Sequence, residues 1–348
     1  MTQARKVVVV ADEVGVYHCI SRCVRRAFLC GEDHYSGRNY EHRRGWVRER
    51  VRFLSGLFGI EVFAYSVMSN HLHLVLRSRP DHVSQWSDGE VAERWCRLFP
   101  GKAALECGQA YDERKLKILL KDSAHLERVR HRLSDLSWFM RCLNESLARR
   151  ANREDRCTGR FWEGRFKCQR LMDPGSILAC MAYVDLNPVR ARIADGLDDS
   201  DFTSVYDRVY AQRAKARLEK LGEPSNPTVE QERQIKRELA RKSGADWLFD
   251  FADPSSPFAG VECEYYLSLV EWTGQRIRSD KPGSLPVNLK PVLDRFGLDA
   301  VEWADNVASY GSLFHRIAGK VEQLLSYARG RGQSWFCGRS GSARLYGT

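Results

Sequence analysis

Two alternating runs joined by three residues restrict the possible folds of this chain more than any other feature. Glu61–Val67 and His71–Arg77 place apolar side chains at alternate positions, and Met68, Ser69 and Asn70 connect them. A period of two is typical of strands, and a short connection between two such runs indicates a hairpin. The fold therefore contains an antiparallel pair of strands.

Helical patterns flank this hairpin. Apolar residues recur at near-helical spacing, and Asp173 followed by Pro174 is a typical helix start. The order strand, helix, strand, strand, helix, strand, helix predicts an α+β fold with a ferredoxin-like antiparallel sheet and flanking helices. Besides the hairpin, the predicted strands are Val7–Val10, Val16–Ile20 and Phe166–Met172, and the predicted helices are Glu41–Leu57, Leu136–Asn152 and Ser176–Leu186.

The character of the sequence changes near residue 215. We predict a catalytic domain over residues 1–215, with an insertion of one or two short helices at about 80–131, and a mainly helical accessory region over 216–348. Val229–Arg241, Tyr265–Arg278 and Leu313–Arg329 carry apolar residues at helical spacing. This region and the basic tail Arg329–Arg344 are either a plain accessory domain or a second DNA contact.

Charge and cysteine content restrict the partner and the compartment. The 348 residues hold 55 Lys and Arg against 45 Asp and Glu, a net charge of +10 that suits a phosphate backbone. No secretion signal or membrane span is recognisable, and the eleven cysteines are expected to be free thiols. We therefore expect a cytoplasmic protein without a membrane partner, either a monomer or a homodimer.

His71 and His73 are a candidate metal pair. Residues two apart on a strand share a face, so both imidazoles point to one place while Leu72 packs on the other side. Two neutral imidazoles suit a divalent cation. Two histidines that alternate with a half-buried core give the same pattern.

Tyr183 and Asn187 are four apart on a predicted helix and so lie one turn from each other. A tyrosine hydroxyl can attack a phosphodiester if a metal polarises the phosphorus, and an amide oxygen one turn away can be a further metal ligand. A tyrosine in the core and an Asn-Pro helix end fit the same residues.

The segment Arg160–Lys167 interleaves cations with aromatic rings. Guanidinium groups bind phosphates while rings stack on unpaired bases, although the aromatic residues equally fit a core. Arg160, Trp162, Arg165 and Lys167 are therefore candidate DNA-binding residues, together with Arg22 and Arg190.

Four motifs in this order resemble the single-tyrosine transposases of the His-hydrophobic-His superfamily, closest to the REP-associated tyrosine transposases. They are YHCISR from Tyr17, VMSNHLHLVL, GRFWEGRFK and AYVDLNPVRA, and the resemblance covers roughly residues 7–210. It implies that His71 and His73 bind a metal, that Tyr183 is the nucleophile, and that Asn187 is a further ligand. Better-known relatives carry Gln at this last position.

The resemblance implies a metal-dependent single-strand DNA transposase and endonuclease that uses Mg²⁺ or Mn²⁺ and acts on single-stranded or hairpin DNA. Tyr183 would form a 5′-phosphotyrosine intermediate, without a nucleotide cofactor. One alternative is a non-catalytic hairpin DNA- or RNA-binding protein derived from a transposase. Others are a replication or conjugation nickase of the same superfamily and a plain metallohydrolase.

Overall fold

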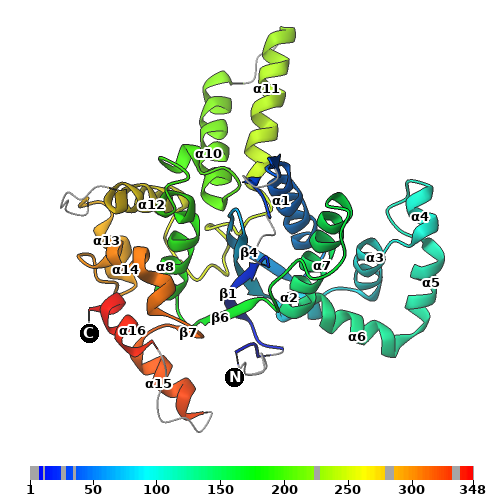
Figure 1. Ribbon diagram of the computed structural model, residues 1–348, viewed down its shortest axis with the longest axis horizontal. Coiled ribbons are helices and arrows are strands. Elements are labelled where there is room, and N and C mark those ends of the chain that lie inside the picture. Colours follow the sequence, from blue (N-terminus) through cyan, green and yellow to red (C-terminus); the bar gives the residue numbers. More distant parts are fainter. Residues whose placement is uncertain are drawn as a thin grey trace. The chain divides into compact units, whose positions relative to one another are not determined.

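The computed structural model describes residues 8–10, 12–24, 29–33, 37–222, 228–278, 286–330 and 338–347. It has an α+β fold with a sheet flanked by helices, as predicted, and this sheet has five strands (Figure 1). The strands are β1 Gly15–Arg22, β2 Glu32–Asp33, β3 Arg38–Asn39, β4 Ile60–Val67, β5 His71–Ser78, β6 Lys167–Leu171 and β7 Ile317–Ala318.

The α-helices of the described residues fall into an earlier and a later group. The earlier helices are α1 His42–Ser55, α2 Pro80–Ser84, α3 Asp88–Leu98, α4 Lys102–Glu106, α5 Glu113–Lys121, α6 Ser123–Ser134 and α7 Leu136–Glu154. The later ones are α8 Pro174–Asp185, α9 Asn187–Arg190, α10 Ser204–Leu221, α11 Val229–Lys242, α12 Cys263–Arg278, α13 Lys290–Arg295, α14 Trp303–Leu313, α15 Val321–Arg329 and α16 Arg339–Tyr346. No helix in the described ranges has the length and apolar character needed to cross a bilayer.

The strand order of the large sheet is β4-β5-β1-β6-β7. Its first four strands have the ferredoxin-like arrangement, and the predicted hairpin is present as β4 and β5. Two compact units divide the chain, and β4, β5 and β6 contribute residues to both. One unit holds α1–α7, and the other holds α8–α16 with β7.

The fifth strand corrects the prediction for the C-terminal region. β7 pairs with β6 in parallel, Arg170 opposite Ile317, so the sheet is not wholly antiparallel. The predicted helix over Leu313–Arg329 is also wrong in part, because α14 ends at Leu313 and α15 begins at Val321. A strand of two residues is too short for an alternating pattern to reveal it.

The unit with α1–α7 pairs α1 with α7. α1 buries Val47, Val51 and Leu54, and α7 runs beside it. Both confirm the predicted helices over Glu41–Leu57 and Leu136–Asn152.

The prediction of one or two short helices in the insertion was wrong, since α2–α6 occupy most of it. Side chains that cap N-termini divide it: Ser87 accepts from the Glu90 amide, Asp112 from Arg114, and Asp122 from His125. Helices this short do not produce a clear period.

The predicted strand Val7–Val10 is also wrong where it can be examined. Val7 lies outside the described residues, and Val8, Val9 and Val10 belong to no strand. β-branched residues form a strand only where a neighbouring strand is available to pair with them. The next predicted strand, Val16–Ile20, is present within β1.

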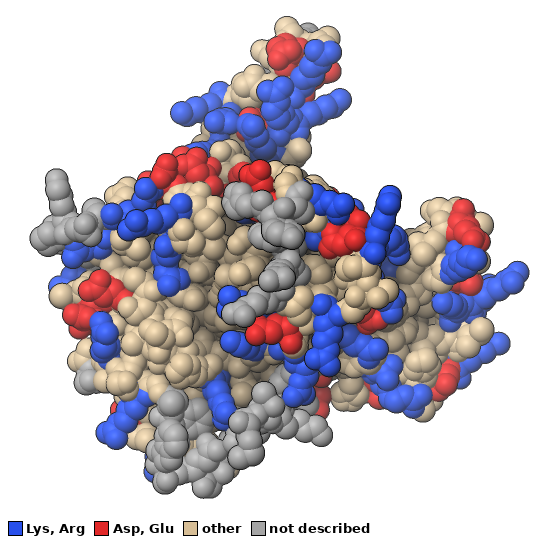
Figure 2. Space-filling view, in the orientation of Figure 1, with Lys and Arg blue, Asp and Glu red and all other residues tan. Residues whose placement is uncertain are grey.

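The other unit is organised around α8, which is buried on nearly all sides. Asp173 caps it by accepting from the Ser176 amide at 2.8 Å, and Pro174 occupies its first turn, as predicted. In the same unit α10 and α11 lie side by side as a helical hairpin, and Figure 2 shows Lys and Arg side chains crowded over it.

Candidate active site

The two predicted metal-binding histidines lie on β5. His71 begins the strand and is half-buried, while His73 is 3% exposed. Burial, and secondarily the charge of Arg22, lower the pKa of His71 to about 4. His71 is therefore neutral at pH 7, which is the form that can bind a cation. Its Nδ1 lies 2.6 Å from the Asn70 Oδ1.

Tyr183 lies on α8, where its ring contacts a cation and an imidazole. The His73 and Tyr183 ring centroids are 5.8 Å apart at 76°. The Arg190 guanidinium lies 4.4 Å from the centroid of the same ring. Tyr183 remains partly exposed, so its environment combines a histidine, a cation and access to solvent.

Tyr183 and Asn187 do not lie on one continuous helix. Arg190 contacts both of them. α8 ends at Asp185, and Asn187 opens the short α9, with Pro188 in its first turn. The Arg190 Nη1 donates to the Asn187 Oδ1 at 3.2 Å. The Asn187 Nδ2 is buried and has no hydrogen-bond partner among the described residues. Arg190 therefore contacts both side chains that the sequence pairs.

These residues offer a metal ion two kinds of donor. The neutral His71 has suitable donor chemistry, and His73 lies two residues along the same strand. The Asn187 oxygen accepts from the Arg190 guanidinium, and a second lone pair on this oxygen remains for a metal ion. In the described part of the chain, no three His, Cys, Asp or Glu side chains are placed to hold an ion.

Two residues of α14 that no sequence pattern indicated complete the surroundings of Tyr183. The Tyr310 ring lies 5.3 Å from the Tyr183 ring, and Tyr310 is 1% exposed. A Cβ at Gly311 would lie 2.7 Å from the Tyr183 Oη and 3.3 Å from its Cζ. The hydroxyl of Tyr183 thus fits against a position where only glycine leaves room.

Both ends of α8 are bonded to the later helices. At its N-terminus, the Lys320 amide donates to the Asp173 Oδ2 at 2.9 Å, and the Tyr346 hydroxyl donates to the same carboxylate. At its C-terminus, the Tyr266 hydroxyl donates to the buried Asp185 carboxylate at 2.5 Å. Desolvation raises the pKa of Asp185, and the nearby Arg208 opposes that rise.

The predicted DNA-binding segment lies at the end of β1. Trp162 forms a bridge with Cys23, and its Nε1 donates to the Asn144 carbonyl of α7 at 2.8 Å. The Arg22 carbonyl accepts from the Glu163 amide at 2.8 Å. Arg22 itself is exposed, as are the other cations of the segment, Arg160, Arg165 and Lys167.

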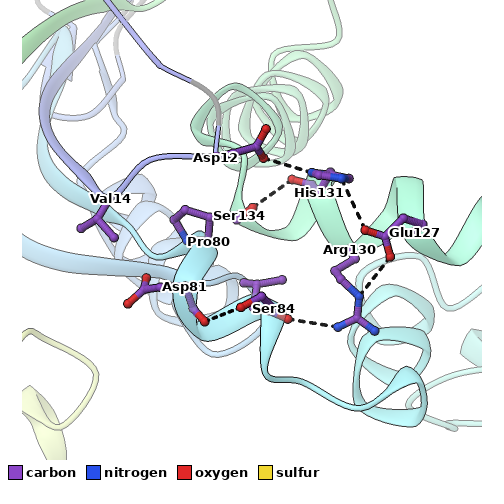
Figure 3. Close-up of a pocket in the computed structure, with 10 residues that line it drawn as sticks. Asp12, Val14, Pro80, Asp81, Ser84, Glu127, Arg130, His131 and Ser134 are labelled. Carbon is purple, nitrogen blue, oxygen red and sulfur yellow. Dashed lines mark hydrogen bonds and ion pairs between the residues drawn. The ribbon is translucent and has the colours of Figure 1, made fainter.

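A separate hollow of about 340 Å³ lies among α2, α6 and the residues before β1 (Figure 3). His131 lies across its rim, 3.1 Å from the Asp12 carboxylate and 3.4 Å from that of Glu127. None of the predicted site residues lines it.

No protein-family description and no curated protein sequence matches this chain. Among solved structures, it is similar to a REP-associated tyrosine transposase bound to a REP hairpin. The sequences are 12% identical, the match covers 60% of this chain and 86% of that one, and the TM-score is 0.36.

Proposed function

We propose that this protein cleaves and rejoins single-stranded DNA, and that Tyr183 is the nucleophile. The observation that carries the proposal is the position of Arg190, whose guanidinium lies 4.4 Å from the Tyr183 ring. A phosphodiester brought to this tyrosine would meet a cation suited to its non-bridging oxygens. The resemblance of the four sequence motifs supports the same assignment, and it suggests hairpin DNA as the substrate.

The proposed reaction consists of two transfers at one phosphorus. The Tyr183 Oη attacks, a tyrosine–phosphorus bond forms, and the bond to the 3′ oxygen breaks. The phenolic proton is lost to solvent, and the departing oxygen takes up a proton to become a 3′-hydroxyl. A second 3′-hydroxyl then attacks the phosphotyrosine and restores the tyrosine. The number of phosphodiester bonds is unchanged, so no nucleotide cofactor is required.

The proposal includes a divalent cation, Mg²⁺ or Mn²⁺, held by His71 and His73. Such an ion would polarise the scissile phosphate and offset the charge that develops there. Asn187 would be a further ligand through the lone pair of its amide oxygen that Arg190 does not use. The remaining guanidinium hydrogens of Arg190 would bind the phosphate.

A second candidate is a hairpin DNA- or RNA-binding protein that no longer cleaves. The observation in its favour is the Asn187 oxygen, which already accepts a hydrogen bond from Arg190 at 3.2 Å. Binding alone would require neither a metal nor the tyrosine hydroxyl.

Incubation with single-stranded hairpin oligonucleotides and Mg²⁺ or Mn²⁺ separates these candidates, with a covalent protein–DNA adduct on a denaturing gel as the measurement. Tyr183→Phe should abolish the adduct and change the Kd for the oligonucleotide by less than about twofold, since the ring and its packing remain. Tyr265→Phe removes a hydroxyl from an exposed tyrosine of α12 and serves as the control. An adduct in the Tyr183→Phe variant would show that another residue is the nucleophile.

The same assay tests the metal. A chelator, His71→Ala or His73→Ala should each prevent the adduct. Leu72→Ala should instead lower the free energy of unfolding by about 2–5 kcal/mol, because it empties a fully buried position. Undiminished adduct in either histidine variant would remove that residue from the metal site.

A further inference from the structure

Three aromatic rings from α3, from the residue that follows it and from α7 gather at the surface. Trp95 of α3 is edge-on to Phe99, with centroids 4.8 Å apart, and to Trp138 of α7, with centroids 5.7 Å apart. Both tryptophans are partly exposed, and Phe99 is 42% exposed. Large rings left in contact with water at one place usually mark a binding surface.

Two arginines stack on these rings. The Arg132 guanidinium lies 4.5 Å from the Trp138 ring and 5.7 Å from the Trp95 ring. The Arg141 guanidinium lies 4.9 Å from the Trp138 ring. Arg132 makes no ion pair with any acidic group in the described part of the chain, and Arg141 pairs with the exposed Glu145 at 3.5 Å. The tryptophan cluster, defined as Trp95, Phe99, Arg132, Trp138 and Arg141, is therefore both aromatic and cationic.

We propose that the tryptophan cluster binds unpaired bases of single-stranded DNA. Aromatic rings and the flat faces of guanidinium groups stack on bases, and the same guanidinium groups attract the neighbouring phosphates. A duplex presents its phosphates but hides the faces of its bases, so this combination selects single strands. The partner is that of the proposed function and to that extent rests on it, but neither Tyr183 nor a metal ion takes part.

The tryptophan cluster lies near the start of α7, the helix that also holds Trp162 in place. Trp138 lies in the first turn of α7, and Asn144, six residues later, accepts the hydrogen bond from Trp162. Six residues of α-helix span about 9 Å. The cluster and the Trp162 segment therefore contact α7 less than two turns apart along its length. The cluster also includes residues of the insertion, for which the sequence had suggested no role.

The test measures affinity for a labelled oligo-dT strand by fluorescence anisotropy, in chelator so that no cleavage occurs. Phe99→Ala should weaken binding by about 5- to 150-fold, the usual cost of losing one stacked base. Its matched control is Phe53→Ala on α1, where the ring is 39% exposed and the Arg50 guanidinium lies 5.1 Å away. That change should leave the affinity within about twofold.

A second pair of variants keeps the test valid if Phe99→Ala fails to fold. Arg141 and Arg149 both pair with Glu145, but of these two only Arg141 is stacked on a cluster ring. Arg141→Gln should weaken binding more than Arg149→Gln. The excess should disappear when the strand carries abasic sites, because only stacking depends on the bases.

The outcomes separate the two proposals. If Phe99→Ala equals Phe53→Ala and Arg141→Gln equals Arg149→Gln, or if abasic strands show the same differences, the cluster does not stack on bases. An equal loss of affinity for duplex would mean that it contacts phosphates only, which also overturns the proposal. If DNA binding depends on the cluster but hairpin oligonucleotides form no adduct in Mg²⁺ or Mn²⁺, the proposed cleavage is refuted and the proposed base-stacking surface is not.

Discussion

Arg190 was predicted to bind DNA, and the structure shows that it also contacts two other residues of the candidate site. The pattern marks it as a DNA contact, and in the structure it lies over the Tyr183 ring and donates to Asn187. A guanidinium has five donors in a flat fork, so it can hold an amide oxygen and still present hydrogens to a phosphate. The two assignments are therefore compatible, and the structure adds a positioning contact to the predicted one.

Gly311→Ala should disturb Tyr183 from the opposite side. The new methyl group would lie 2.7 Å from the Tyr183 Oη, well inside van der Waals contact, so the ring or α14 must shift. We expect the free energy of unfolding to fall by about 1–3 kcal/mol, as overpacking does, and the rate of adduct formation to fall with it. Chemical denaturation and the adduct assay measure the two effects.

Two further variants identify the cause. In a Tyr183→Phe background the nearest clash is gone, so Gly311→Ala should cost clearly less than it does alone. Gly45→Ala on α1 meets nothing within 4 Å and should stabilise by about 0.5–1 kcal/mol, as expected for a helix interior. If Gly311→Ala lowers the free energy of unfolding equally in both backgrounds, the new methyl group does not clash with the Tyr183 hydroxyl.

The sequence predicts His71, His73 and Tyr183 as candidates because strand and helix periods relate residues close along the chain. It could not reveal Tyr310 or Gly311, which reach Tyr183 only through tertiary packing. The orientation of the Asn187 amide was equally hidden, because it depends on which atom Arg190 approaches.

At the level of elements, the predicted helices and strands that exist are those with a full period or a clear start signal. The hairpin of β4 and β5, the helices α1 and α7, and the capped start of α8 are all present. The failures are the short elements. The helices of the insertion depend on individual caps. The two buried residues of β7 form a strand because they pair with the edge of β6.

The bond between α12 and α8 gives an element-level prediction. Tyr266→Phe removes the hydroxyl that donates to Asp185, a carboxylate buried in the same unit. Loss of this bond leaves a buried oxygen without the tyrosine donor and should lower the free energy of unfolding by about 1–3 kcal/mol. The adjacent Tyr265 is 43% exposed, so Tyr265→Phe should change it by less than about 0.5 kcal/mol. Equal unfolding curves for the two variants would contradict the assigned bond.

On the scale of the whole chain, the predicted division at residues 215 and 216 lies inside α10. The residues after it supply Tyr266, Tyr310, Lys320 and Tyr346 to the surroundings of α8. α8 buries side chains on nearly all sides, and a helix that is apolar all round requires cover all round.

A chain that ends at Leu221 should therefore fail to fold cooperatively. Near-ultraviolet circular dichroism should show the loss of fixed aromatic packing, and thermal unfolding should broaden or vanish. A sharp transition at the temperature of the full chain would show that α8 is covered without these residues.

The parallel pairing of β6 with β7 also has a consequence in time. Arg170 and Ile317 become neighbours only after every residue between them has been synthesised, whereas only three residues separate β4 from β5. Contacts between distant positions are the slow ones in folding, because the intervening chain must first lose its freedom. At about 5–20 residues per second, a nascent chain thus carries Tyr183 for several seconds before α14 exists to receive it. During that interval β6 has no β7 to pair with, so this edge of the sheet is open. Open sheet edges are where nascent chains associate wrongly.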